Sequence, residues 1–312
     1  MNIKPIQNTC LYGMDRYFFE IFNLYKNNIM PNKILFSGKK GIGKSTLSYH
    51  LINYILSVDE EYSYDQKEFK INEKNKSYKL IQNNTHPNFY LIDLIDEKKS
   101  IDVAQVREMI AYTNKSSFND MPRFILIDNI ENLNNNSINA LLKIIEEPNK
   151  NIFFLLIHNN EKKILPTLKS RCLTFKINFS FNENILISNK LIKGNVFEQI
   201  NYDLISYYNT PGEIINLINF ANEKKIDLKV YLLRDLLRLI IDKAYYKKNK
   251  PIKEMITNFI ELYFLKEYKL NNKKNSLLNI YHYFINKIYN AEKFNLDEES
   301  LFLEFRSKLL NE

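Results

Sequence analysis

The sequence predicts an α/β domain built on a parallel β-sheet, followed by a small helical lid and an all-α C-terminal domain. A glycine-rich loop lies between a short apolar strand and a helix, within residues 33–52. Apolar strands then alternate with amphipathic helices, which is typical of a doubly wound sheet. From about residue 179 onward the apolar spacing is helical only. We therefore expect domains at residues 1–178, 179–222 and 223–312.

The glycine-rich loop at residues 37–46 fits the pattern G-x-x-x-x-G-K-[ST], which wraps the phosphates of a nucleotide. The chain has only 6 glycines, and three of them lie in this loop, so a chance glycine-rich turn is disfavoured. In this pattern the lysine reaches the β- and γ-phosphates and the serine hydroxyl binds Mg²⁺. The expected nucleotide-binding residues are Gly38, Gly41, Gly43, Lys44, Ser45 and Thr46.

The other elements of the first domain follow from apolar spacing. A helix is expected within residues 11–29, before the first strand. After the loop helix, residues 58–84 are rich in polar side chains, which predicts an exposed insertion. A strand is expected at residues 89–92, and Asp102 is expected to N-cap the helix that follows. Continuous apolar runs predict three more strands, at residues 123–128, 152–157 and 173–177.

An aspartate, Asp128, ends the strand at residues 123–128. Behind a phosphate-binding loop such a carboxylate holds Mg²⁺, directly or through water, so Ser45 and Asp128 are the expected metal-binding pair. ATP-hydrolysing proteins of this kind carry a glutamate at the next position, where this chain has Asn129. A carboxamide cannot accept a proton from the attacking water, so weak or absent hydrolysis is expected. Glu131 lies two residues further along, and we do not expect it to substitute.

Composition excludes several classes of protein. The 312 residues are 45% hydrophobic and 26% charged, as in an ordinary globular protein. The apolar runs are too short to span a bilayer and the N-terminus lacks a signal-peptide core, so we expect a cytoplasmic protein without a membrane partner. Cys10 and Cys172 are too few for a disulfide framework or a cysteine-based zinc site. The net charge of +8 is compatible with a nucleic-acid partner, although the lysines are spread along the chain.

Two motifs are highly specific: N-A-L-L-K-I-I-E-E-P at residues 139–148 and S-R-C at residues 170–172. With them, the chain resembles the bacterial clamp-loader family of AAA+ proteins, and within it the delta prime type of subunit of DNA polymerase III. The resemblance covers roughly residues 8–178, whereas the C-terminal half matches only in its helical character. Further matching segments lie at residues 11–15, 37–46, 85–88, 101–107, 124–128 and 165–169.

The resemblance implies a hetero-pentameric ring with gamma/tau and delta subunits, which opens a sliding clamp and places it on primed DNA within the DNA polymerase III holoenzyme. It implies ATP or ADP with Mg²⁺ as ligand and a C-terminal domain in the collar of the ring. It also implies that Arg171 is an arginine finger acting in trans at a neighbouring subunit's ATP site. A guanidinium suits that task because it is always charged and offers a planar fork to phosphate oxygens.

The chain departs from the delta prime pattern in two respects. Many such subunits carry a cysteine-ligated zinc module after the loop helix, but residues 58–84 contain no cysteine, so no zinc is expected. Many also have a degraded phosphate-binding loop, whereas this loop is intact. The intact loop leaves open an ATP-hydrolysing gamma/tau-type motor or another AAA+ ATPase, and so leaves open whether the chain is itself an enzyme.

Two residues favour the non-motor hypothesis. One is Asn129. The other is Glu213, which lies about where motor subunits place a sensor arginine that touches the γ-phosphate, and where an acidic side chain would repel it. A P-loop nucleotide kinase is disfavoured, because residues 139–148 and 170–172 have no role in such an enzyme.

Overall fold

The computed structural model describes residues 4–95, 98–115, 119–146, 151–248, 250–270, 274–294 and 296–310. Two compact units divide the chain: residues 1–187 with 210–212, and residues 188–209 with 213–312. These units do not follow the predicted boundaries at residues 178 and 222, and the separate lid and C-terminal domains stay a prediction. Within the described ranges, every helix is too short or too polar to cross a membrane.

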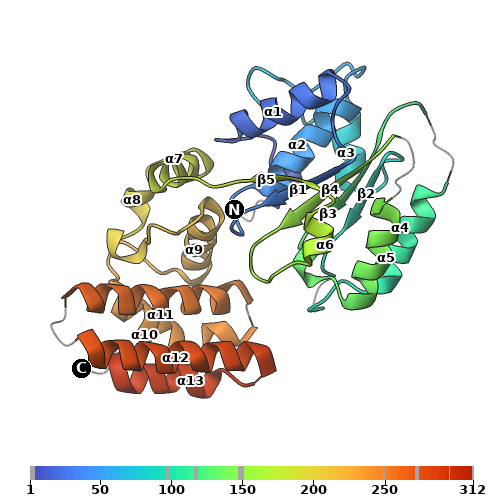
Figure 1. The fold of residues 1–312 in the computed structure, drawn as a ribbon. Helices are drawn as coiled ribbons and strands as arrows, with labels where there is room; N and C mark the ends of the chain where they lie inside the picture. Colours follow the sequence, from blue (N-terminus) through green and yellow to red (C-terminus); the bar gives the residue numbers. More distant parts are fainter. Residues whose placement is uncertain are drawn as a thin grey trace. The chain divides into compact units, whose positions relative to one another are not determined.

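A parallel sheet of five strands, in the order β2-β3-β4-β1-β5, forms the centre of the first unit (Figure 1). The predicted α/β class and each predicted strand are confirmed, with ends that differ by one or two residues at most. Because all strands are parallel, their C-terminal ends meet at one edge of the sheet, where ligands bind in such folds. The strands are β1 (Lys33–Ser37), β2 (Phe89–Ile92), β3 (Arg123–Ile127), β4 (Ile152–His158) and β5 (Leu173–Lys176).

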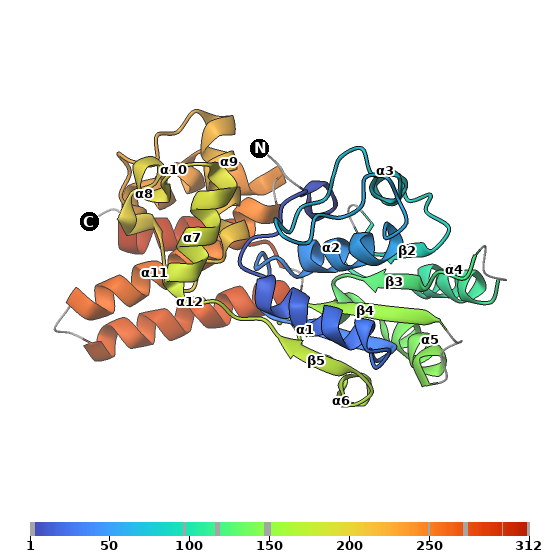
Figure 2. The same ribbon diagram turned by 90° about the horizontal axis from the view of Figure 1, so that it is seen from above.

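Helices cover both faces of this sheet (Figure 2). In β3, Phe124 and Leu126 pack into the core on one face, whereas Ile125 and Ile127 pack into the core on the other, as strand periodicity requires. One face is covered by α1 (Asp15–Lys26), α2 (Lys44–Leu56) and α3 (Lys76–Gln82). The other is covered by α4 (Val103–Thr113), α5 (Asn135–Glu146) and the short α6 (Pro166–Lys169). Asp102 caps α4 as predicted and forms a capping box with Gln105.

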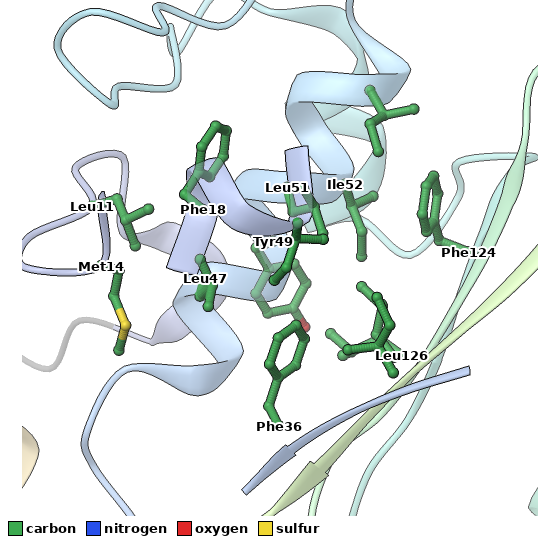
Figure 3. Packing of buried hydrophobic residues seen from close by; sticks show 14 of the residues in the cluster. Leu11, Met14, Phe18, Phe36, Leu47, Tyr49, Leu51, Ile52, Phe124 and Leu126 are labelled. Carbon is green, nitrogen blue, oxygen red and sulfur yellow. The ribbon is translucent and has the colours of Figure 1, made fainter. Parts of the chain in front are cut away.

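The segment at residues 58–84 is only partly the exposed insertion that its polar sequence suggested. It contains α3, and it buries four apolar or aromatic side chains: Tyr64, Ile71, Tyr78 and Ile81. The Tyr64 ring stacks on Phe18 with 5.4 Å between ring centroids. Figure 3 shows Phe18 in the α1–α2 core against which this segment packs. Isolated aromatic residues between polar ones anchor the segment, and they form no periodic pattern that sequence analysis could detect.

A buried histidine ties this segment to the N-terminus. His50 of α2 is fully buried, and its Nε2 bonds to the carbonyl oxygen of Asn8 at 2.9 Å. Its Nδ1 lies 3.0 Å from the hydroxyl of Tyr64. Burial lowers the pKa of His50 to about 4, so the ring is neutral at pH 7. His50 therefore has a structural role, as its place on a helix indicated.

The second unit is helical. The fully buried ring of Phe284 lies 5.3 Å from that of Phe305 and 6.1 Å from that of Phe264, which centres its core on the longer helices. Its helices are α8 (Val196–Gln199), α9 (Pro211–Lys224), α10 (Leu233–Asp242), α11 (Lys250–Leu270), α12 (Lys274–Phe294) and α13 (Glu299–Phe305). The unit boundary after residue 187 falls within α7 (Phe181–Ile192), and α9 begins in the segment 210–212 of the first unit.

Candidate nucleotide site

The loop between β1 and α2 has a backbone that only glycine accommodates. Gly41 and Gly43 have φ angles of 79° and 105°, in the left-handed region that side chains disfavour. At Gly38 a Cβ atom would lie 2.3 Å from the carbonyl oxygen of Ile177, so no side chain fits. The loop ends at the N-terminus of α2, whose unpaired N–H groups and positive dipole end favour an anion.

Lys44 is the first residue of α2 and is 3% exposed. Its Nζ donates to the carbonyl oxygens of Gly38 and Lys39, at 2.8 Å each. Burial lowers the pKa of Lys44 to about 8, against the opposing charges of Asp128 and Glu131. The ammonium group is thus mostly charged at pH 7 and is held within the loop.

The hydroxyl of Ser45 and the carboxylate of Asp128 meet across the sheet edge, with 2.5 Å between Ser45 Oγ and Asp128 Oδ2. Burial and the neighbouring Asp93 raise the pKa of Asp128 to about 6. A hydroxyl and a carboxylate beside an anion-binding loop fit Mg²⁺, which takes few protein ligands and completes its shell with waters and phosphate oxygens. Thr46 is buried in the first turn of α2. Together with the loop, Ser45 and Asp128 form one site.

Asn129 lies at the position where we expected no catalytic base. Both its carboxamide nitrogen and its carboxamide oxygen are hydrogen-bonded. It has a left-handed backbone, with φ 54°. Its Nδ2 donates to Asp93 Oδ1 at 2.7 Å, and its Oδ1 accepts from Asn159 Nδ2 at 2.9 Å. The Asn129 side chain is therefore hydrogen-bonded to residues that follow the two neighbouring strands, β2 and β4.

Glu131 lies in the turn after Asn129 and is 8% exposed. Its Oε1 accepts from the backbone N–H of Asn159 at 2.9 Å. Its Oε2 is buried and has no hydrogen-bond partner among the described residues. The contact ties the turn after β3 to the end of β4, so Glu131 supports the strand ends that carry the site.

Of the two polar residues at the end of β4, Asn159 is the one that joins this network. His158 instead contacts Ser37 Oγ through Nδ1 at 3.3 Å and the carbonyl oxygen of Lys162 through Nε2 at 2.8 Å. Through these contacts His158 connects the end of β1 with the loop that follows β4. His158 thus has structural contacts, whereas Asn159 points toward Asn129.

A short segment at residues 210–212 backs the phosphate-binding loop. The backbone N–H of Gly212 donates to the carbonyl oxygen of Gly41 at 2.9 Å, and Thr210 Oγ1 donates to that of Lys40, also at 2.9 Å. A Cβ atom on Gly212 would lie 2.7 Å from the Cα of Gly41. The segment can approach the loop this closely because residue 212 is glycine.

Glu213 belongs to the second unit, whereas Arg171 belongs to the first. Within the second unit, Glu213 accepts from Asn209 Nδ2 at 3.2 Å. Arg171, just after α6, is bonded through Nη2 to Glu146 Oε1 at 2.7 Å and through Nη1 to the carbonyl oxygen of Thr167 at 2.8 Å. In the part of the chain that the structure describes, no hydrogen bond or ion pair links Arg171 to the loop. Glu147 and Pro148 of the second motif lie outside the described residues.

An open groove of about 790 Å³ lies between α4 and α5. Its lining combines an apolar floor with two exposed cations, Arg107 and Lys143. The remaining polar lining residues are Asn114, Asn136 and Asn139. Positive charge with amide donors suits contact with phosphate groups.

Asp93 is the site residue that sequence analysis missed. It follows β2 directly, and the register Ile92↔Ile127 places it beside Asp128. The signal that could have found it is its place at the end of a buried strand. That signal becomes specific only when β2 and β3 are known to be neighbours, which the strand order supplies.

Comparison with known proteins identifies both delta' and gamma subunits of DNA polymerase III as relatives. The family described as "DNA polymerase III, delta subunit" matches residues 15–180. DNA polymerase III subunit delta' of Pseudomonas aeruginosa is 31% identical over 138 residues, which cover 44% of this chain and 40% of that protein. DNA polymerase III subunit gamma of Buchnera aphidicola subsp. Schizaphis graminum is 30% identical over 204 residues, which cover 62% and 53%. The chain thus spans about half the length of these relatives.

A solved structure shares the fold. It is a DNA polymerase III gamma subunit-related protein of Thermotoga maritima, with a TM-score of 0.53 and 15% sequence identity. The match covers 91% of this chain and 96% of that one. At this identity the likeness supports the fold and nothing more specific.

Proposed function

The chain belongs to the family described as DNA polymerase III, delta subunit, and from this premise we propose that it is a clamp-loader subunit of the delta prime type. In this proposal it helps to place a sliding clamp on primed DNA, binds ATP with Mg²⁺ without hydrolysing it efficiently, and donates Arg171 to a neighbouring subunit. The observation that carries the proposal is the glycine loop with Lys44, Ser45 and Asp128 beside it, next to Asn129, whose carboxamide is hydrogen-bonded to Asp93 and Asn159.

Binding is assigned to the loop and the two strand ends. Nucleotide phosphates would accept from the loop N–H groups, and Lys44 Nζ would exchange its two carbonyl partners for phosphate oxygens. Ser45 and Asp128 would hold the Mg²⁺, which would neutralise phosphate charge. The gain for Lys44 is electrostatic, because a buried cation interacts more strongly with phosphate than with neutral carbonyl groups.

Slow hydrolysis is expected because Asn129, and not a glutamate, follows the metal-binding Asp128. Asn129 offers a carboxamide, whose Nδ2 donates to Asp93 and whose oxygen accepts from Asn159. A general base contributes typically about 10²–10⁴-fold to such a reaction. Without one at residue 129, bound ATP would persist.

Arg171 suits action in trans because its guanidinium is exposed and, among the residues that the structure describes, is held by one ion pair and one carbonyl group. A phosphate oxygen of a neighbouring subunit could replace Glu146 at little cost, since exposed ion pairs contribute only about 0–1 kcal/mol. A finger of this kind is worth roughly 10³–10⁵-fold in phosphoryl transfer.

The remaining partners are assigned to two surfaces. The groove between α4 and α5 would contact the phosphates of primed DNA through Arg107 and Lys143. The helical second unit would join gamma/tau and delta subunits in a hetero-pentameric ring. Exposed apolar residues on α11 and α12 supply contact area for that purpose: Leu265, Leu270, Leu278, Ile280 and Tyr289.

A purified chain tests the proposal directly. We expect Mg²⁺-dependent binding of ATP that is lost in Lys44→Ala, together with turnover far below that of a motor subunit. The intact loop and the gamma relative favour a second function, an ATP-hydrolysing gamma/tau-type motor. Turnover comparable to known motors and dependent on Lys44 would establish the motor and refute the first proposal.

A further inference from the structure

An ion pair joins the phosphate-binding loop to the loop after β4. Lys40 Nζ, in the loop between β1 and α2, lies 3.1 Å from Glu161 Oε1. A second contact joins the end of β1 to the same stretch, because Ser37 Oγ donates to Asn160 Oδ1 at 2.9 Å. Two consecutive residues of the loop after β4, Asn160 and Glu161, therefore contact both the beginning and the middle of the loop that would wrap the phosphates.

The backbone of Lys40 is held separately from its side chain. Its carbonyl oxygen accepts from Thr210 Oγ1 at 2.9 Å, and the carbonyl oxygen of Gly41 accepts from the backbone N–H of Gly212, also at 2.9 Å. By contrast, the Lys40 side chain is 45% exposed and the Glu161 side chain is 38% exposed. The ammonium group can therefore change partners while the backbone that would bind the phosphates stays in place.

The Lys40 side chain also begins next to the ammonium group of Lys44. Lys44 Nζ donates to the carbonyl oxygen of Lys39 at 2.8 Å, and this carbonyl belongs to the peptide group that joins Lys39 to Lys40. Consecutive Cα atoms are only about 3.8 Å apart, so the Lys40 side chain starts within a few ångströms of that contact. A flexible four-carbon stem would allow its ammonium group to move between Glu161 and a phosphate bound at the loop.

We propose that Lys40 is a second phosphate-binding cation and that Glu161 is a positioning residue that competes with phosphate for it. The inference rests on the proposed function and adds control of nucleotide release to it. Without nucleotide, Glu161 neutralises the Lys40 ammonium and holds it against the loop after β4. When nucleotide binds, the ammonium exchanges one oxyanion partner for another, and when nucleotide leaves, Glu161 takes the ammonium back. Because exposed ion pairs are weak, this exchange would require little free energy.

A double-variant cycle separates an exchange of partners from charge effects that act over a distance. Four full-length proteins are compared: wild type, Lys40→Gln, Glu161→Gln and the double variant. The Kd and the dissociation rate of a fluorescent, non-hydrolysable ATP analogue with Mg²⁺ are measured for each by stopped flow, beside the Tm. Lys163→Gln is the matched control, because it removes the same charge as Lys40→Gln from an exposed residue of the loop after β4.

We expect Lys40→Gln to raise Kd about fivefold, and Glu161→Gln to lower Kd and slow release about three- to fivefold, which is the fold-change that an exposed ion pair supplies. In the Lys40→Gln background, Glu161→Gln should change Kd by less than about twofold, because the ammonium for which Glu161 competes is gone. Lys163→Gln should leave Kd nearly unchanged. A gain of affinity in Glu161→Gln cannot result from a folding defect, so this variant stays informative even if Lys40→Gln lowers the Tm.

The outcomes separate this inference from the proposed function. If Glu161→Gln lowers Kd by the same factor with and without Lys40, Glu161 acts on the phosphates only through its charge, and the inference is overturned. It is also overturned if Lys40→Gln binds nucleotide as the wild type does, or no more weakly than Lys163→Gln. A wild type that binds no ATP overturns both the inference and the proposed function. Hydrolysis of ATP as fast as by a motor subunit overturns the proposed function alone, because Kd and release still report on Lys40.

Discussion

The pair between Arg171 and Glu146 allows the finger role to be tested against a purely structural one. The perturbation is Arg171→Ala. The side chains of Arg171 and Glu146 are 36% and 52% exposed, so their ion pair at 2.7 Å is well solvated. Such pairs contribute about 0.2–1 kcal/mol, and in a chain of this size that lowers Tm by only about 1–3 °C.

The expected effect on catalysis is far larger than the effect on stability. Loss of a finger costs about 10³–10⁵-fold at the site that it serves. In a ring with several ATP sites, the total rate of ATP hydrolysis falls only by the contribution of the one site that Arg171 serves. We therefore expect nearly unchanged stability and assembly, with one ATP fewer in the hydrolysis burst of each ring.

The assay is a rapid-quench burst of ATP hydrolysis by the reconstituted ring with sliding clamp and primed DNA. Glu146→Ala is the matched control, because it breaks the same ion pair and leaves the guanidinium in place. It should retain the full burst. The reasoning is refuted if Arg171→Ala also retains the full burst, or if both variants lose it equally, since a lost ion pair would then be sufficient explanation.

Three further predictions concern the loop and the core of the first unit. Lys44→Ala should abolish Mg²⁺-dependent nucleotide binding in a fluorescence titration while the circular dichroism spectrum stays unchanged; retained affinity would show that phosphates do not use the buried ammonium. Gly212→Ala should weaken nucleotide binding, because its Cβ would lie 2.7 Å from the Cα of Gly41. Gly194→Ala is the control, because a Cβ there would make an ordinary van der Waals contact with Gln199 Nε2 at 3.8 Å; equal affinities of the two variants would contradict the role of the Gly212 contact. The folded pKa of His50 lies below its unfolded value of 6.5, so its stabilising contribution is complete above pH 6.5 and is lost as the pH falls toward 4. The free energy of unfolding, measured with denaturant, should fall by about 3 kcal/mol over this pH window. If the free energy of unfolding of a His50→Gln variant depends on pH as steeply as that of the wild type, the effect does not come from His50.

Local patterns in the sequence were sufficient to predict the strands of the first unit and its helices α1, α2 and α4. The strand at residues 89–92 is predictable because it is a short apolar run. The capping role of Asp102 is predictable because the side chain bonds to a residue only three positions further along the chain. The loop glycines are predictable for the same reason, since the motif is contiguous. The segment at residues 58–84 was predicted only in part, because Tyr64 and Ile71 are buried in a core that also contains Phe18, a residue distant in the sequence.

Asp93 shows why part of the site could not be predicted. Its contact with Asn129 joins residues 36 positions apart, on strand ends that become neighbours only through the sheet order. By contrast, the absence of a general base at position 129 could be predicted, because it follows from a single residue type, the asparagine next to Asp128. The pairing of Arg171 with Glu146, 25 positions apart, was likewise invisible to sequence analysis.

The place of β1 in the sheet has a consequence for synthesis of the chain. The strand that leads into the phosphate-binding loop lies between β4 and β5, and its last residue, Ser37, meets His158 across 121 residues of sequence. At about 5–20 residues per second, the ribosome needs roughly 6–24 s to supply that partner. During this delay Ile34, Leu35 and Phe36, which the folded protein buries fully, have no sheet to join. β1 can therefore complete its pairing only after β4 and β5 have been synthesised.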